Sequence, residues 1–253
     1  MNTARGPREV AGAALSAEPI VTFVDLDAAR PLLFATEDAL PCLSPEDRAR
    51  AERKGGDVET LMRWRAARIA TRIVLERYAG PTIRSVDFIL ADGGRPELPA
   101  GMPVFNVSHS GGVALIAVAQ SGAVGIDIEG ARTLSMSLER RQRLVTAAAA
   151  IDAACDALDP ASDDDVLRAW VRLEAVAKAL GSGIGRMLTA HGVIAQSTGV
   201  RGMDDRVASL RVGDLSVPEG YVAAIAATAL PEHVDVQRFP ATADALSQYL
   251  ADV

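Results

Sequence analysis

The sequence is poor in lysine and cysteine and has no long apolar run, and each scarcity narrows what the chain can be. Among 26 basic residues only Lys54 and Lys178 are lysines. Two isolated cysteines, Cys42 and Cys155, are too few for a disulfide framework, so we expect packed thiols in a reducing, cytoplasmic setting. No apolar run approaches the roughly 18 residues that span a bilayer. A formal net charge of −7 argues against nucleic acid or an anionic membrane as the partner.

The composition is globular and large enough for a substantial core. With 253 residues, 49% of them apolar, the chain suits one large domain or two small ones. Residues 1–19 hold no sustained apolar segment, so we expect a flexible tail and not a signal peptide. The order strand, helices, strands then recurs weakly, which predicts an N-terminal half, 20–119, and a C-terminal half, 120–253. The predicted fold class is α+β: two pseudo-symmetric halves, each a small, mostly antiparallel sheet packed with helices.

Local signals outline most elements. Ser44 followed by Pro45 and Glu46 is typical of a helix N-terminus, with a capping side chain, proline at the first helical position and an acid near the positive end of the helix dipole. We expect helices at about 45–54, 58–78, 134–156 and 163–180, and outer strands at 20–26, 85–90, 191–195, 208–212 and 221–229. The type of the end segment, 239–250, is ambiguous.

Three apolar strands follow one another closely in the middle of the chain. The segments 104–107, 113–119 and 124–129 predict an antiparallel meander. Between the first two, residues 106–112 are rich in Ser and Gly and predict a turn with free backbone N–H groups.

Arginine is concentrated in the two helices expected at 45–54 and 58–78. Arg65, Arg68 and Arg72 recur at steps of three and four residues, so they share a helix face. Two interpretations remain open: a solvated helix surface, or a docking surface for an anion or an acidic partner.

The strand at 124–129 carries two acids. Asp127 and Glu129 point the same way, because side chains alternate along a strand, while Val124, Ile126 and Ile128 point into a core. Two like charges on a buried strand are costly unless a positive charge lies between them. A divalent cation would serve, and oxygen ligands favour magnesium, manganese or calcium over zinc. A solvated strand end explains the two acids equally well.

The helix expected at 163–180 places a charged pair in apolar surroundings. Glu174 and Lys178 are four residues apart, so they share a face and can meet. The helix is apolar almost all round, which predicts that this pair faces a cleft or a site. Because the chain otherwise uses arginine, a lysine here indicates a need for an ammonium group.

Four groups then require one explanation: Asp127 with Glu129 on a strand, Glu174 with Lys178 on a helix, the Ser108-His109 pair, and Arg95 in a turn. Three carboxylates and a lysine suit a magnesium ion that bridges phosphate oxygens, and His and Arg suit further phosphates. This set resembles the 4′-phosphopantetheinyl transferase superfamily, in its long, two-half, surfactin-synthetase-activating form. The motifs that carry the resemblance are Gly94-Arg95-Pro96, Phe105-Asn106-Val107-Ser108-His109-Ser110, Val124-Gly125-Ile126-Asp127-Ile128-Glu129, and Trp170 to Ala179 followed by Gly181 and Gly183.

The resemblance implies a reaction and its participants. Coenzyme A, bound in a cleft between the halves, would give its phosphopantetheine arm to a serine of an acyl or peptidyl carrier protein, as in secondary metabolism, and release adenosine 3′,5′-bisphosphate. Asp127, Glu129 and Glu174 would hold Mg²⁺, with Mn²⁺ as a substitute. Glu174 or a water on the metal would take the serine proton, and Lys178 would stabilise charge on the pyrophosphate. The phosphates would be held by Arg95, Ser108 and His109. A monomer is expected.

Two departures from the family pattern keep other functions open. Leu173 stands where the family has a lysine, and the Ala-rich residues 147–150 stand where it has an aromatic-rich stretch. The alternatives are a non-catalytic coenzyme A-binding homologue and a metal-dependent nucleotide phosphohydrolase.

Overall fold

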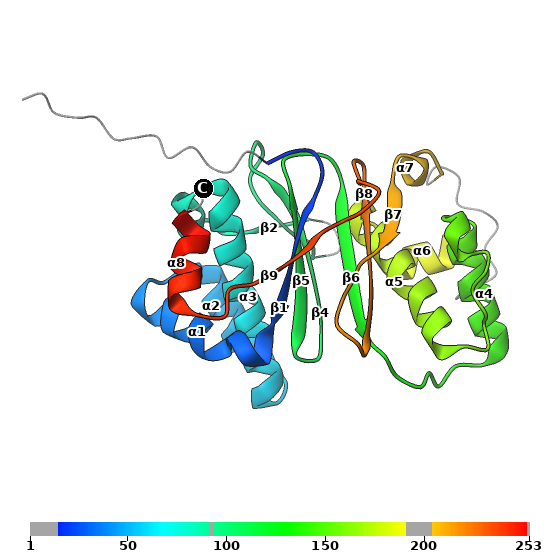
Figure 1. Cartoon of the computed structure of the whole chain (residues 1–253), viewed down its shortest axis with the longest axis horizontal. Helices are drawn as coiled ribbons and strands as arrows, with labels where there is room; N and C mark the ends of the chain where they lie inside the picture. Colours follow the sequence, from blue (N-terminus) through cyan, green and yellow to red (C-terminus); the bar gives the residue numbers. More distant parts are fainter. Residues whose placement is uncertain (1–14, 92–93, 191–203, 252–253) are drawn as a thin grey trace, which may run out of the picture.

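The computed structural model describes residues 15–91, 94–190 and 204–251, which form two sheets covered on their outer sides by helices (Figure 1). The first sheet has the strand order β4-β5-β1-β9. Its strands are β1 (Ile20–Asp25), β4 (Val104–Ser110), β5 (Val113–Ala119) and β9 (Val236–Arg238). Its helices are α1 (Leu26–Ala39), α2 (Pro45–Arg53), α3 (Val58–Ala79) and α8 (Ala243–Ala251).

The second sheet has the order β6-β8-β7. It consists of β6 (Val124–Gly130), β7 (Arg211–Asp214) and β8 (Tyr221–Ala227), packed with α4 (Leu138–Ala149), α5 (Asp163–Leu180), α6 (Ile184–Ala190) and α7 (Asp204–Ala208). The smaller elements are the 3₁₀ turns η1 (Pro81–Ser85) and η2 (Ala153–Cys155) and a hairpin of β2 (Ile89–Leu90) and β3 (Pro96–Glu97). Within the described residues the pairings are antiparallel apart from that of β1 with β9, which is parallel, so the α+β prediction is confirmed.

Three hydrophobic clusters hold the layers together. One lies between the first sheet and its helices, and another lies between the second sheet, α4 and α5. The third lies between the two sheets, where Val21 and Leu115 meet Ile126 and Ile225. Burial of these alternating side chains on both faces of each sheet is the main favourable term, at about 25 cal/mol for each Å² of apolar surface.

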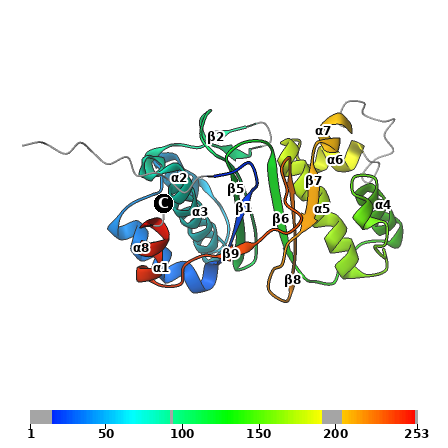
Figure 2. The same cartoon turned by 45° about the horizontal axis from the view of Figure 1, so that its top comes forward.

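The predicted meander is wrong at its third strand. β4 and β5 pair antiparallel, but β6 pairs with β8 in the other sheet (Figure 2). The turn predicted at 106–112 is also wrong, because β4 continues through Ser110 in register with β5 and only Gly111 and Gly112 turn the chain. The motif segment is therefore mostly a strand and not a turn with free backbone N–H groups.

The other predicted helices and strands agree with the structure only in part. The helix predicted at 163–180 is confirmed as α5, whereas the helix predicted at 134–156 shortens to α4 and η2. The predicted strand at 191–195 and residues 1–14 of the predicted tail lie outside the described residues. The segment 239–250 is largely helix α8.

The C-terminal segment returns to the first sheet. β9 pairs with β1, and Leu246 of α8 joins the hydrophobic cluster of the N-terminal helices. By its contacts this segment therefore packs with residues 20–119. The division of the chain at residue 120 and the pseudo-symmetry of the halves stay predictions.

Most of the arginines on α2 and α3 are engaged within the protein. Arg72 is fully buried and pairs with Asp47, and Arg63 pairs with Asp27. A solvated surface therefore does not describe the part of this helix face that holds Arg72. No helix within the described ranges is both long enough and apolar enough to cross a membrane.

Candidate functional site

The two sheets meet where β4 lies alongside β6. Hydrogen bonds from polar side chains of β4 connect the two strands there, and not the backbone hydrogen bonds of a paired sheet. Asn106, Ser108 and Ser110 alternate along β4 and face β6. The Asn106 Oδ1 atom accepts from the Ile126 N–H at 3.0 Å, and the Ser110 Oγ atom accepts from the Gly130 N–H at 3.1 Å. Backbone donors of β6 that would otherwise stay unpaired are thereby satisfied.

The same serines fix the two acids of β6. The Ser108 hydroxyl donates to Asp127 Oδ1 at 2.7 Å, and the Ser110 hydroxyl donates to Glu129 Oε2 at 3.2 Å. Asp127 is 3% exposed. The two carboxylates are therefore held side by side at the seam, as the strand pattern predicted.

Lys178 is the centre of this cluster. Its ammonium group lies 2.7 Å from Asp127 Oδ1, 3.1 Å from Ser108 Oγ and 3.1 Å from the Ile126 carbonyl oxygen. Glu174, one turn earlier on α5, is 3.9 Å from the same nitrogen. The prediction that Glu174 and Lys178 share a face toward a site is consistent with this arrangement, although Lys178 contacts Asp127 more closely than Glu174.

A close approach of α5 to β6 makes this arrangement possible. Gly125 lies directly under the helix, and a Cβ atom there would overlap the carbonyl oxygen of Ala175 and the backbone nitrogen of Ala179. Only glycine allows the helix backbone to lie this near the strand. Glu174 and Lys178 can therefore reach the acids of β6.

The carboxylates outnumber the cations around them. Burial, together with the negative charges of Asp127 and Glu129, raises the pKa of Glu174. Burial also raises the pKa of Asp127, although Lys178 and Ser108 oppose the shift. Glu129 is paired with Arg132 at 2.8 Å. Among the described residues, three carboxylates thus face two cationic side chains, which leaves this cluster short of positive charge.

A pocket of about 330 Å³ opens beside this cluster. Asn106, Glu174 and Lys178 line one part of it, and the turn residues Gly94, Arg95 and Pro96 line another, together with Val107, Ala177, Gly181, Gly183 and Ile184. Leu173 does not line it: this side chain is 1% exposed and lies in the cluster of the second sheet. A lysine at position 173, as in the family pattern, would therefore begin on the buried side of α5 and not in the pocket.

His109 lies away from Ser108, because neighbouring residues of a strand point to opposite faces. It lines a smaller pocket of about 160 Å³ with Trp64 and Arg68, and Pro96 and Val107 are shared with the pocket of Lys178. The two pockets therefore adjoin. The predicted phosphate-binding pair Ser108-His109 is split between them.

The surroundings of His109 are positively charged. The ring is exposed toward the pocket, yet the surrounding protein desolvates it, and this effect, together with Lys178, Lys54 and Arg68, lowers its pKa. Arg68 itself is 12% exposed and lies 3.4 Å from Asp47, a carboxylate that it shares with Arg72. One carboxylate thus serves two arginines, which favours an anion in the pocket.

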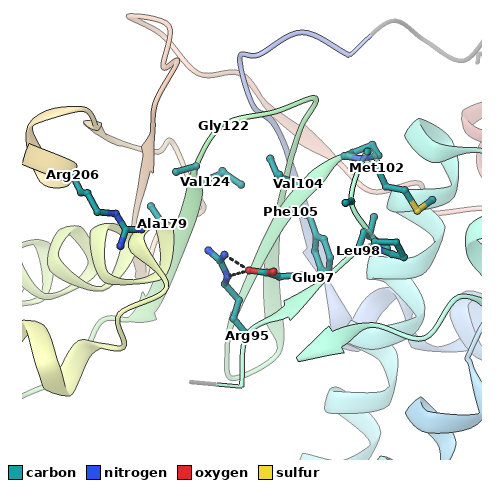
Figure 3. Close-up of a pocket in the computed structure, with 15 residues that line it drawn as sticks. Arg95, Glu97, Leu98, Met102, Val104, Phe105, Gly122, Val124, Ala179 and Arg206 are labelled. Atoms are coloured by element: carbon teal, nitrogen blue, oxygen red, sulfur yellow. Dashed lines mark hydrogen bonds and ion pairs between the residues drawn. The ribbon is translucent and has the colours of Figure 1, made fainter. Parts of the chain in front are cut away.

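Arg95 lies at a third pocket, of about 400 Å³, shown in Figure 3. Its guanidinium group crosses the seam and donates to the Lys178 carbonyl oxygen at 2.8 Å. It also pairs with Glu97. The predicted phosphate ligand is thus bound to protein groups in this structure.

Sequence reasoning missed Asn106, Ser110, Arg68 and Glu97 as members of the site. The alternation of polar residues at 106, 108 and 110 was the available signal for the first two, since a strand with one polar edge requires a partner. Arg68 was indicated only as one of three arginines on a helix face that could dock an anion, and Glu97 gave no signal.

Comparison with known proteins bears on the second sheet. Residues 123–226 match the model of the 4′-phosphopantetheinyl transferase superfamily. A protein of Synechocystis sp., provisionally named as a 4′-phosphopantetheinyl transferase, is 34% identical over 90 residues. That alignment covers 34% of this chain, and the chain spans only about a third (36%) of the length of the relative. The matched residues include β6, α5 and β8, so the part of the chain that carries Asp127, Glu129, Glu174 and Lys178 is similar to this superfamily.

Proposed function

We propose that this protein transfers the phosphopantetheine arm of coenzyme A to a serine of an acyl or peptidyl carrier protein in a magnesium-dependent reaction. The observation that carries the proposal is the cluster of Asp127, Glu129, Glu174 and Lys178, brought together from β6 and α5 within the family match. Two adjoining pockets, lined by Lys178 on one side and by His109 and Arg68 on the other, offer an elongated polyanion several positive groups.

The site suits a divalent cation by its charge. The Asp127 Oδ2 atom is buried and has no hydrogen-bond partner among the described residues. Three carboxylates against Lys178 and Arg132 also favour one further cation. In this structure the Lys178 ammonium group lies against Asp127, and no three side chains of the described residues are close enough together to bind a metal ion. Asp127, Glu129 and Glu174 would hold the ion, and oxygen ligands are those that Mg²⁺ and Mn²⁺ prefer.

The reaction asks mainly for positioning and charge neutralisation. When bound, Mg²⁺ supplies positive charge to the pyrophosphate oxygens. The carrier serine Oγ forms a bond to the β-phosphorus of coenzyme A, and the bond from that phosphorus to the departing adenosine 3′,5′-bisphosphate oxygen breaks. Glu174, which lines the pocket beside Lys178, takes the serine proton as the general base. Lys178 donates to the phosphate oxygens on which charge increases.

One assay separates this proposal from its alternatives. The protein is incubated with coenzyme A, Mg²⁺ and several apo carrier proteins, and the carrier masses are measured. Added phosphopantetheine on a carrier is the expected result. Bound coenzyme A without transfer to any carrier would favour a non-catalytic homologue, a reading to which the direct Asp127–Lys178 ion pair gives some support. Hydrolysis without a carrier would indicate a phosphohydrolase.

Coenzyme A binding should be accompanied by proton uptake at His109. The lowered pKa keeps the imidazole neutral near pH 7 in the free protein, and a bound phosphate would raise that pKa. The affinity should therefore rise as the pH falls from about 8 to about 6, by roughly threefold to tenfold for a shift of up to one unit. Calorimetric titration in buffers of different ionisation enthalpy measures the uptake, and His109→Gln should abolish it. Equal uptake in the variant would remove His109 from the site.

A further inference from the structure

Arg95 is held on two sides by groups of the protein itself. Its Nη1 atom donates to the Lys178 carbonyl oxygen at 2.8 Å, and its Nε and Nη2 atoms both reach Glu97 Oε1, the former at 3.1 Å. Figure 3 shows the two side chains pointing toward one another in the pocket. Arg95 and Glu97 are two residues apart, across the start of β3, so they share a face.

A carboxylate that accepts from two N–H groups of one arginine occupies the position that a phosphate would take. The guanidinium group presents parallel N–H donors that match carboxylate and phosphate oxygens equally well. Arg95 lines both the pocket of Lys178 and the larger pocket, whereas Glu97 lines only the larger one. Glu97 thus holds the guanidinium group on the side away from the Glu174–Lys178 cluster.

We propose that Glu97 is a built-in competitor of the substrate: it occupies Arg95 until a phosphate of coenzyme A displaces it, and so sets the affinity for coenzyme A. This inference rests on the proposed function and on the expectation from the sequence that Arg95 contacts a phosphate of coenzyme A. Glu97 acts through Arg95 and is a positioning residue. The contact with the Lys178 carbonyl oxygen keeps Arg95 at the seam during the exchange.

The pair is exposed enough to exchange. The Arg95 side chain is 27% exposed and that of Glu97 is 38% exposed. Ion pairs of this kind contribute modestly because water competes for both partners. Removing the competing carboxylate should therefore tighten coenzyme A binding by about threefold to fivefold, a range that corresponds to the upper part of measured surface pairs.

The test is calorimetric titration of coenzyme A into the wild-type protein, Glu97→Gln, Arg95→Gln and the double variant. We expect tighter binding in Glu97→Gln, weaker binding in Arg95→Gln, and no further effect of Glu97→Gln once Arg95 is replaced, since the carboxylate acts only through that residue. Glu97→Ala provides a second variant that also lacks the carboxylate. Glu46→Gln is the matched control, because it removes an equal charge from another exposed Arg–Glu pair, Arg53–Glu46.

The outcomes separate the two proposals. Equal affinity in the wild-type protein and both Glu97 variants overturns the competitor role while leaving the proposed function in place. Tightening that persists in the Arg95→Gln background, or that Glu46→Gln reproduces, also overturns it. Absence of coenzyme A binding in every variant, the wild-type protein included, overturns both the competitor role and the proposed function.

Discussion

Replacing Asp127 by alanine should reduce phosphopantetheine transfer by at least about 10²-fold, the scale on which loss of one preorganised electrostatic group acts. The substitution removes the buried Oδ2 atom that has no partner among the described residues and the carboxylate nearest to Lys178. Mn²⁺ binding, followed by electron paramagnetic resonance, should weaken in parallel. Transfer is measured from the carrier mass at a moderate Mg²⁺ concentration.

The fold should survive this change. Burial raises the pKa of Asp127, so the ionised carboxylate is a costly group to bury, and removing it relieves part of that cost. Lys178 loses a partner but is 24% exposed and can be hydrated. Thermal unfolding should stay cooperative. Asp164→Ala, at the exposed start of α5, is the control and should keep full activity. Full transfer by Asp127→Ala would refute the metal role of this carboxylate.

Gly125→Ala should be the most damaging change to the fold among those considered. The added methyl group would overlap the Ala175 carbonyl oxygen and the Ala179 backbone nitrogen, and helix backbone cannot yield as a flexible side chain can. Overpacking of this kind costs about 2–3 kcal/mol and can cost more. For a chain of this size the melting temperature should fall by about 5–10 °C.

The same substitution should damage the site by moving α5 away from β6. Lys178 reaches Asp127 at 2.7 Å only because the helix lies directly over Gly125, so coenzyme A and Mn²⁺ should bind more weakly even below the melting temperature. Gly185→Ala is the matched control: an added methyl group there contacts nothing within 4 Å, and alanine favours the helix α6 that contains it. A variant Gly125→Ala as stable as Gly185→Ala would contradict the close packing.

The arginines of α2 and α3 show what the sequence alone could not predict, namely which of them faces a pocket. The three- and four-residue steps of its arginines indicated a shared face, and the sequence allowed either solvent or an anion there. The structure buries Arg72 against Asp47 and turns Arg68 toward the pocket of His109. Which arginine meets an anion depends on where a distant strand places that histidine, and helical periodicity carries no such information.

The sequence by itself determined the local elements of the site. Alternation along 124–129 placed Asp127 and Glu129 on one side, and the apolar pattern of 163–180 with its acidic start gave the bounds of α5. These features follow from covalent geometry and from the burial of nearby side chains, so a short window of residues suffices to recognise them.

Only the tertiary structure decided which elements meet. β6 could have paired with β5, its neighbour in the chain, but it pairs with β8, while the side chains of β4 complete its other edge. The choice depends on burying both faces of two sheets at once, a competition among segments far apart in the chain. The same packing brought Arg95 to the Lys178 carbonyl oxygen, placed His109 beside Arg68, and let α5 lie so close over Gly125 that Lys178 reaches Asp127.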